Sequence, residues 1–111
     1  MQLSEIINVN RIRSDLNVKS KKRALEALSE LVTQGQSQLD SSYIFDSLIS
    51  RERLGATGVG YGIAIPHGRI KNCKQITGAF IHFEQGVDFD AVDNQPVDMM
   101  FALVVPEEST D

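Results

Sequence analysis

The chain has 111 residues, of which 41% are hydrophobic, and its formal net charge at pH 7 is −4. This composition predicts one small domain, residues 1–111, with enough apolar side chains for a core, and its acidic balance argues against nucleic acid as the main partner. No apolar run approaches the roughly 20 residues that span a bilayer, no secretory signal is visible, and the single cysteine has no partner for an internal disulfide, so we expect a cytoplasmic protein without membrane insertion.

The first third of the chain predicts one helix after two weaker elements. Residues 3–7 are typical of a short helix or turn, and residues 12–18 of a short extended piece. Ser20 is a suitable N-cap for a helix over residues 20–34. The apolar residues of this helix recur at helical spacing and predict its buried stripe: Leu25, Leu28, Leu31 and Val32. Gly35 is well placed to end the helix.

A second helix is predicted from residue 42 to residue 54, with Asp40 or Ser41 as its cap. Its buried stripe would consist of Ile44, Phe45, Leu48 and Ile49, with Leu54 near its end. Arg51 and Arg53 fall in the last turn, where positive charge is favourable, and Gly55 follows as the stop signal.

The segment after this helix is rich in glycine and leads to a histidine. Four of the chain's eight glycines lie between Gly55 and Gly62, and a glycine costs about 1 kcal/mol in a helix interior, so we expect a tightly bent loop. Residues 63–65 predict a short buried strand that stops at Pro66. His67 is then expected at a strand end, where an imidazole could serve as a nucleophile, a base or a metal ligand.

The second half predicts two buried strands, over residues 77–83 and residues 97–105, because both runs are apolar on both faces. Between them we expect a turn at residues 84–86, a short extended segment at 87–91 and a polar turn at 93–96. Residues 106–111 look like the approach to another helix. Because such a sheet needs helices on both faces, we expect the chain to be incomplete at its C-terminus, and an exposed sheet face would favour self-association.

Three stretches of the sequence resemble a known family. They are residues 20–26 (SKKRALE), residues 51–69 (RERLGATGVGYGIAIPHGR) and residues 89–98 (FDAVDNQPVD). They are similar to the enzyme IIA domains of the fructose/mannitol superfamily of the phosphotransferase system. The Gly62-x-x-x-Pro66-His67 motif is specific to it, and the last stretch favours the nitrogen-regulatory type.

The resemblance implies an α/β fold with a mixed β-sheet flanked by helices, and a phosphocarrier that accepts a phosphoryl group on His67. It implies an HPr-type donor (NPr-like), charged through an enzyme I from phosphoenolpyruvate, and regulatory targets such as potassium transporters or sensor kinases. Family members continue past the position of Asp111 into helices that carry a second active-site histidine. His82 lies outside the family's motif and is not its substitute.

Phosphoryl transfer to histidine needs one neutral ring nitrogen that faces the donor, while the other donates to an acceptor such as a backbone carbonyl of the glycine-rich loop. We predict attack by the outward nitrogen, giving tele-phosphohistidine. Donors for the phosphate would come from the loop and from two guanidinium groups. The predicted phosphate contacts are Arg51, which matches the family's active-site arginine, Thr57, Gly58, Gly68 and Arg69. No metal and no cofactor is expected.

Several alternatives remain open at this stage. The chain could be a sugar-specific IIA component that passes phosphate to a IIB domain, or a protein-interaction module without phosphotransfer. Cys73 is most simply an incidental surface thiol, although its neighbouring lysines could lower its pKa. The basic run at residues 21–23 fits a solvated face or a partner-binding patch better than a phosphate cradle. The glycine series matches neither nucleotide-binding pattern.

Overall fold

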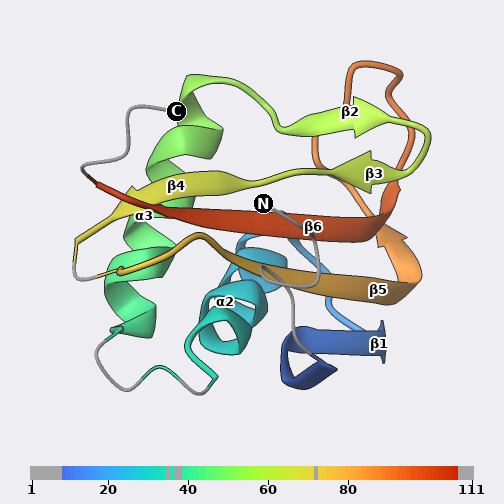
Figure 1. Ribbon diagram of the computed structural model, residues 1–111. Helices are drawn as coiled ribbons and strands as arrows, with labels where there is room; N and C mark the ends of the chain where they lie inside the picture. The colour runs from blue at the N-terminus through green and yellow to red at the C-terminus, as the bar shows by residue number, and fades with distance from the viewer. Residues whose placement is uncertain (1–8, 35, 37–38, 72, 108–111) are drawn as a thin grey trace.

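The structure is a computed structural model that describes residues 9–34, 36, 39–71 and 73–107. Its centre is a six-stranded mixed sheet in which five strands follow the order β1-β5-β6-β3-β2 (Figure 1). The sixth strand, β4, pairs with β6. The elements are η1 (Val9–Arg11), β1 (Ile12–Leu16), α2 (Lys21–Val32), α3 (Ser41–Leu54), β2 (Gly58–Gly60), β3 (Ile63–Ala64), β4 (His67–Ile70), β5 (Thr77–Val87) and β6 (Val97–Pro106). The fold class predicted from the sequence is therefore confirmed.

The first predicted helix is α2, and its start follows from the cap. Ser20 has an extended backbone, and its side-chain oxygen accepts a hydrogen bond from the backbone nitrogen of Arg23 at 3.2 Å. The predicted apolar stripe is buried in the core. The helix ends at Val32, with Thr33 as its C-cap. The element predicted for residues 3–7 and the stop expected at Gly35 lie outside the described residues.

The second predicted helix is α3, which is capped by Asp40 through a 3.0 Å bond from the backbone nitrogen of Ser42. Ile44 and Leu48 are fully buried, and Gly55 follows the helix as expected. Leu54 is 85% exposed, so its place at the end of the buried stripe was wrong. The last turn of α3 reaches the mouth of a cleft, and Leu54 lines it. In the described part of the chain, no helix is long and apolar enough to cross a membrane.

The sheet is built around β6, which confirms the strand predicted for residues 97–105. On one side β6 pairs with β5 in antiparallel register, and on the other it pairs with β3 and β4 in parallel. The turn predicted at residues 84–86 was wrong, because these residues belong to β5, where the register shifts between His82 and Val87. Gly86 allows the close packing there, since a Cβ at Gly86 would lie 2.6 Å from the Cβ of Pro96.

Two short strands appear that the sequence did not predict. Residues 58–60 form β2, an edge strand paired with β3, and residues 67–70 form β4. Pro66 separates β3 from β4 because it lacks a backbone N–H, while its carbonyl accepts from the backbone nitrogen of Leu103 at 3.0 Å. His67 therefore lies at a strand end, as expected, and the strand that it begins is β4.

The two described helices lie on one face of the sheet (Figure 1). Alternate residues of β6 face them and are fully buried: Met100, Ala102 and Val104. The residues between them, Phe101, Leu103 and Val105, point to the opposite face and are half-buried. In the pairing of β4 with β6, His67 lies opposite Leu103 and Arg69 opposite Val105, so both belong to this face.

Candidate functional site

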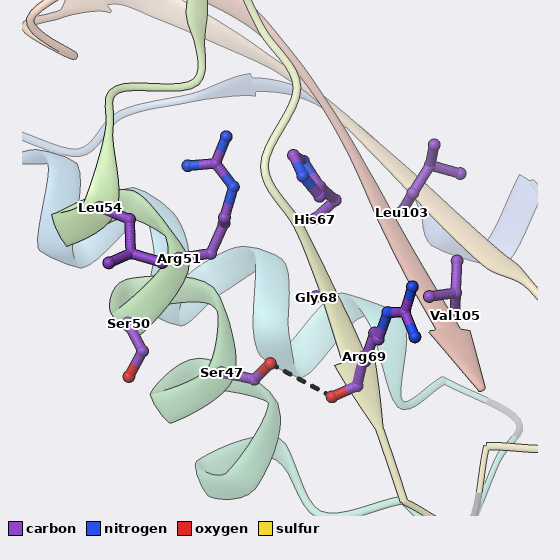
Figure 2. A pocket seen from close by; sticks show the side chains of 9 residues that line it. All are labelled: Ser47, Ser50, Arg51, Leu54, His67, Gly68, Arg69, Leu103 and Val105. Carbon is purple, nitrogen blue, oxygen red and sulfur yellow. Dashed lines mark hydrogen bonds between the residues drawn. The ribbon is translucent and has the colours of Figure 1, made fainter. Parts of the chain in front are cut away.

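An open cleft of about 710 Å³ lies where α3 meets the edge strand β4. Its lining comes from the last turns of α3, from β4 and from β6: Ser47, Ser50, Arg51, Leu54, His67, Gly68, Arg69, Leu103 and Val105 (Figure 2). Two guanidinium groups and an imidazole line it, and no carboxylate does so among the described residues. The electrostatics of the cleft therefore favour an anion.

Strand pairing sets the position of His67. In the register of β4 and β6, His67 lies opposite Leu103, and Arg69 lies opposite Val105, so all four side chains share the sheet face that points away from the helices. His67 is exposed at the cleft, as Figure 2 shows. A partner can therefore reach its ring without rearrangement of the core.

One hydrogen bond distinguishes the two ring nitrogens of His67. Its Nδ1 lies 3.1 Å from the carbonyl oxygen of Ile65. A carbonyl oxygen can only accept, so Nδ1 carries the proton in this bond, and Nε2 is left with its lone pair. The acceptor is a backbone carbonyl, as the sequence predicted, but it belongs to Ile65, after the glycine-rich segment.

Gly68 allows α3 to approach β4 closely. A Cβ at Gly68 would lie 2.5 Å from Oγ of Ser47 and 3.7 Å from Cδ2 of Leu48. Ser47 in turn donates from Oγ to the carbonyl oxygen of Arg69 at 3.4 Å. This close packing places Arg51, one turn further along α3, on the cleft wall facing His67 (Figure 2).

Arg51 and Arg69, two of the predicted phosphate contacts, both line the cleft. Nη1 of Arg51 donates to the carbonyl oxygen of Gly55 at 2.7 Å, which closes the loop at the end of α3. A guanidinium carries five N–H donors, so this bond leaves others that can serve an anion in the cleft.

Thr57 and Gly58 are not among the residues that line the cleft. Thr57 is 5% exposed, and its hydroxyl donates to Oε1 of Glu52 at 2.5 Å. Gly58 lies in β2, where a Cβ would meet the Cβ of Ala91 at 2.9 Å. In this structure both residues are engaged in internal packing rather than directed at the space beside His67.

Glu52 is the residue of this region that the sequence analysis missed. Its side chain is 3% exposed, and its carboxylate accepts from Thr57 and from Nζ of Lys21, the latter at 3.0 Å. A signal was available, because Glu52 follows Ile44 and Leu48 at intervals of four residues and so falls on the buried stripe of α3. A buried carboxylate needs partners.

Two other sequence interpretations change. Cys73 is 7% exposed, and burial raises the pKa of its thiol, so the incidental surface thiol and the lysine-lowered pKa were both wrong. Lys21 forms an ion pair with Glu52, so the basic run at residues 21–23 is not wholly a solvated face.

His82 lies on β5, with Nδ1 3.3 Å from Oδ1 of Asp15, and it does not line the cleft. Among the described residues no group of three or more potential metal ligands occurs.

Comparisons with known proteins agree with this architecture. The family model described as "Phosphoenolpyruvate-dependent sugar phosphotransferase system, EIIA 2" matches residues 5–111. The nitrogen regulatory protein of Klebsiella oxytoca is 46% identical over 111 residues, with 99% of this chain and 68% of that protein covered. The nitrogen regulatory protein of Pseudomonas aeruginosa is 42% identical, with 100% and 72% covered.

Two solved structures are similar in fold. The nitrogen regulatory protein IIA-Ntr of Neisseria meningitidis superposes with a TM-score of 0.89 at 46% identity, over 96% of this chain and 72% of that one. IIA mannitol of Escherichia coli superposes with a TM-score of 0.77 over 91% and 72% of the two chains. At 20% identity the second likeness supports the fold alone.

Proposed function

Because the chain belongs to the EIIA 2 family of the phosphoenolpyruvate-dependent sugar phosphotransferase system, we propose that it is a phosphocarrier that accepts a phosphoryl group on Nε2 of His67. The observation that carries the proposal is the bond from Nδ1 of His67 to the carbonyl of Ile65. It leaves Nε2 with its lone pair in a cleft lined by two arginines.

The chemical step is a transfer between two imidazoles. The Nε2 lone pair of His67 attacks the phosphorus of a phosphohistidine on an HPr-type carrier, in line with the bond that breaks. That P–N bond cleaves, and its electron pair returns to the carrier's imidazole nitrogen. The proton on Nδ1 of His67 stays in place, where the carbonyl of Ile65 stabilises the positive charge that the ring gains.

The phosphoryl group would then be held by charge-assisted hydrogen bonds. The phosphoryl group brings close to two negative charges into the cleft. Among the described residues, no carboxylate lines this cleft. Arg51 lines the cleft from α3 and Arg69 lines it from β4, and a guanidinium matches the geometry of phosphate oxygens. This is the role we propose for both residues.

We further propose that the output is regulatory, with partner binding that depends on the phosphorylation of His67. The relatives that the chain matches over nearly its whole length are nitrogen regulatory proteins, while a fructose-specific EIIA component of Haloferax volcanii is 37% identical over 87 residues. Addition of the phosphoryl group would neutralise most of the positive charge that the two arginines give the cleft, which would change the proteins that dock there. Proteins of potassium transport or sensor kinases are the targets we would test first.

The experiment that tests the carrier function is phosphorylation of the chain by phosphoenolpyruvate, an enzyme I and an HPr-type carrier, followed by intact mass. We expect the gain of one acid-labile phosphate, and its complete loss in His67→Gln. The matched control is His82→Gln, which changes the other histidine of the chain and should leave the gain unchanged. Absence of phosphate on the folded parent chain, or phosphate that persists in His67→Gln, would refute the proposal.

A further inference from the structure

A buried carboxylate joins three parts of the fold next to the cleft. Glu52, on α3, is 3% exposed at its side chain. It accepts from the backbone nitrogen of Thr57 at 2.9 Å, from the hydroxyl of Thr57 at 2.5 Å and from Nζ of Lys21, on α2, at 3.0 Å. A carboxylate is costly to bury unless it is paired and hydrogen-bonded, and this one has a donor on each oxygen. The arrangement holds the peptide of Thr57 in one place.

The carbonyl group of Thr57, on the other side of its Cα, leads toward the imidazole of His67. The carbonyl oxygen of Thr57 accepts from the backbone nitrogen of Ile65 at 3.0 Å. The carbonyl oxygen of Ile65 is the acceptor for Nδ1 of His67 at 3.1 Å. A path of three hydrogen bonds, joined by the backbone of Thr57 and of Ile65, therefore runs from the Glu52 carboxylate to the ring.

We propose that Glu52 and Thr57 are positioning residues that set the tautomer and orientation of His67 through this path. The inference rests on the proposed phosphorylation of His67, and it assigns Thr57 a role different from the phosphate contact expected from the sequence. Neither residue touches the phosphoryl group; each acts through the peptides of Thr57 and Ile65.

The loop between α3 and β2 needs such an anchor because it has little else to fix it. Residues 55 and 56 are glycine and alanine, whose side chains offer no hydrogen bonds. Two consecutive residues of α3 hold the loop from opposite sides. Arg51 bonds the carbonyl of Gly55 on the cleft side, and Glu52 bonds Thr57 on the buried side. Release of Thr57 would therefore loosen the partner of Arg51 as well as that of His67.

Lys21 supplies the counter-charge for the Glu52 carboxylate. Its Nζ also lies 3.2 Å from Oδ2 of Asp90 and 5.4 Å from the centre of the Phe89 ring. Since Phe89 is fully buried, these contacts fix the ammonium group beside Glu52. The N-terminal turn of α2 thus takes part in positioning the site.

The test compares Glu52→Gln, Thr57→Val and Thr57→Ser with the parent chain in two measurements. Long-range ¹H–¹⁵N spectra of unphosphorylated protein report the protonated ring nitrogen of His67, and intact mass reports the rate of phosphoryl transfer from the HPr-type carrier. We expect Glu52→Gln and Thr57→Val to lower the fraction with a proton on Nδ1 and to slow transfer at least about tenfold. Thr57→Ser retains the hydroxyl and should behave like the parent.

The matched control is Glu30→Gln, which removes an exposed carboxylate of α2 and should change neither measurement. Parent-like spectra or parent-like rates in folded Glu52→Gln and Thr57→Val would overturn the proposal. If Glu52→Gln does not fold, the valine and serine variants of Thr57 decide, because valine exchanges the hydroxyl of Thr57 for a methyl group, whereas serine keeps the hydroxyl and loses only the methyl group. If the parent accepts no phosphate, the proposed function fails, while a tautomer shift in the variants still establishes the path.

Discussion

At the scale of single residues, the contact between Nδ1 of His67 and the carbonyl of Ile65 selects one tautomer of the neutral imidazole. In water both ring nitrogens find hydrogen-bond partners, and the two neutral tautomers interconvert. In the folded chain the acceptor faces one nitrogen, so the other presents its lone pair to the cleft. If His67 is the phosphoryl acceptor that we propose, its nucleophilic nitrogen is oriented before a donor binds, which lowers the reorganisation that the transfer requires.

Gly58 provides a prediction at the same scale. A methyl group at residue 58 would lie 2.9 Å from the Cβ and 3.1 Å from the Cα of Ala91, so Gly58→Ala requires a backbone shift. We expect it to lower the free energy of unfolding by about 1–3 kcal/mol, as overpacking of a core typically does. Urea denaturation measures the change.

The control for this prediction is Gly55→Ala, because a Cβ there has only Nη1 of Arg51 within 4.0 Å and its φ of 172° suits any residue. It should change stability by less than about 1 kcal/mol. Combining Gly58→Ala with Ala91→Gly should restore part of the loss. Equal stability of Gly58→Ala and the parent would show that the contact with Ala91 is not restrictive.

The glycines also show how far the sequence predicts the site. Their clustering indicates backbone that must bend or pack closely, and it marks the segment that leads to His67. It does not distinguish a glycine that admits a ligand from one that admits a neighbouring chain. Gly58 faces Ala91 and Gly68 faces Ser47, and these partners come from segments distant in the sequence.

At the scale of elements, the hairpin of β2 and β3 is fastened by one exposed carboxylate. Asp93 accepts from the backbone nitrogen of Tyr61 at 3.0 Å and from that of Gln95 at 3.1 Å. Tyr61 has a φ of 59°, a left-handed conformation that is costly for a bulky residue. The hydrogen bonds from Tyr61 and Gln95 lower the pKa of Asp93 below its ordinary value of 3.8.

This lowered pKa predicts a pH dependence of stability. Because the folded-state pKa lies below the unfolded value, the contribution of Asp93 is fully present above about pH 3.8 and is lost as the pH falls through the folded-state pKa. We expect Asp93→Asn to be less stable than the parent near pH 6, with a difference that shrinks at lower pH. Urea denaturation across this range measures it.

The control is Asp46→Asn, which removes an exposed carboxylate of α3 and leaves the hairpin unchanged. A difference between the parent and Asp93→Asn that stays constant with pH would contradict the role of the charged carboxylate at Tyr61.

Elements differ in how well the sequence predicts them. Both helices follow from local signals, since Ser20 and Asp40 cap them and their apolar stripes recur at helical spacing. The strands β2 and β4 escape such analysis, because they are short and contain Gly58, Gly60 and Gly68. Their extended conformation depends on hydrogen bonds to the neighbouring strands β3 and β6. The local sequence of each segment does not reveal this pairing.

At the scale of the whole molecule, the cleft depends on three segments that meet at one edge of the sheet. The strand β6 carries β3 and β4 in succession on one side, and α3 packs against β4 through Gly68. The sequence predicted the central strand and the family resemblance, and both are confirmed. It could not place the side chain of His67 on the sheet face that points away from the helices, because that follows from the register of His67 with Leu103.

Phosphorylation at Nε2 of His67 is tested most sharply by assigning the nitrogen that carries the phosphoryl group. The chain would be ¹⁵N-labelled at histidine, phosphorylated through the HPr-type carrier and examined by long-range ¹H–¹⁵N spectra. We expect phosphorus on Nε2 of His67 and a proton retained on Nδ1, where it is donated to the carbonyl oxygen of Ile65. Phosphorus on Nδ1 would contradict it, because the hydrogen bond to Ile65 would then have to break for transfer to occur.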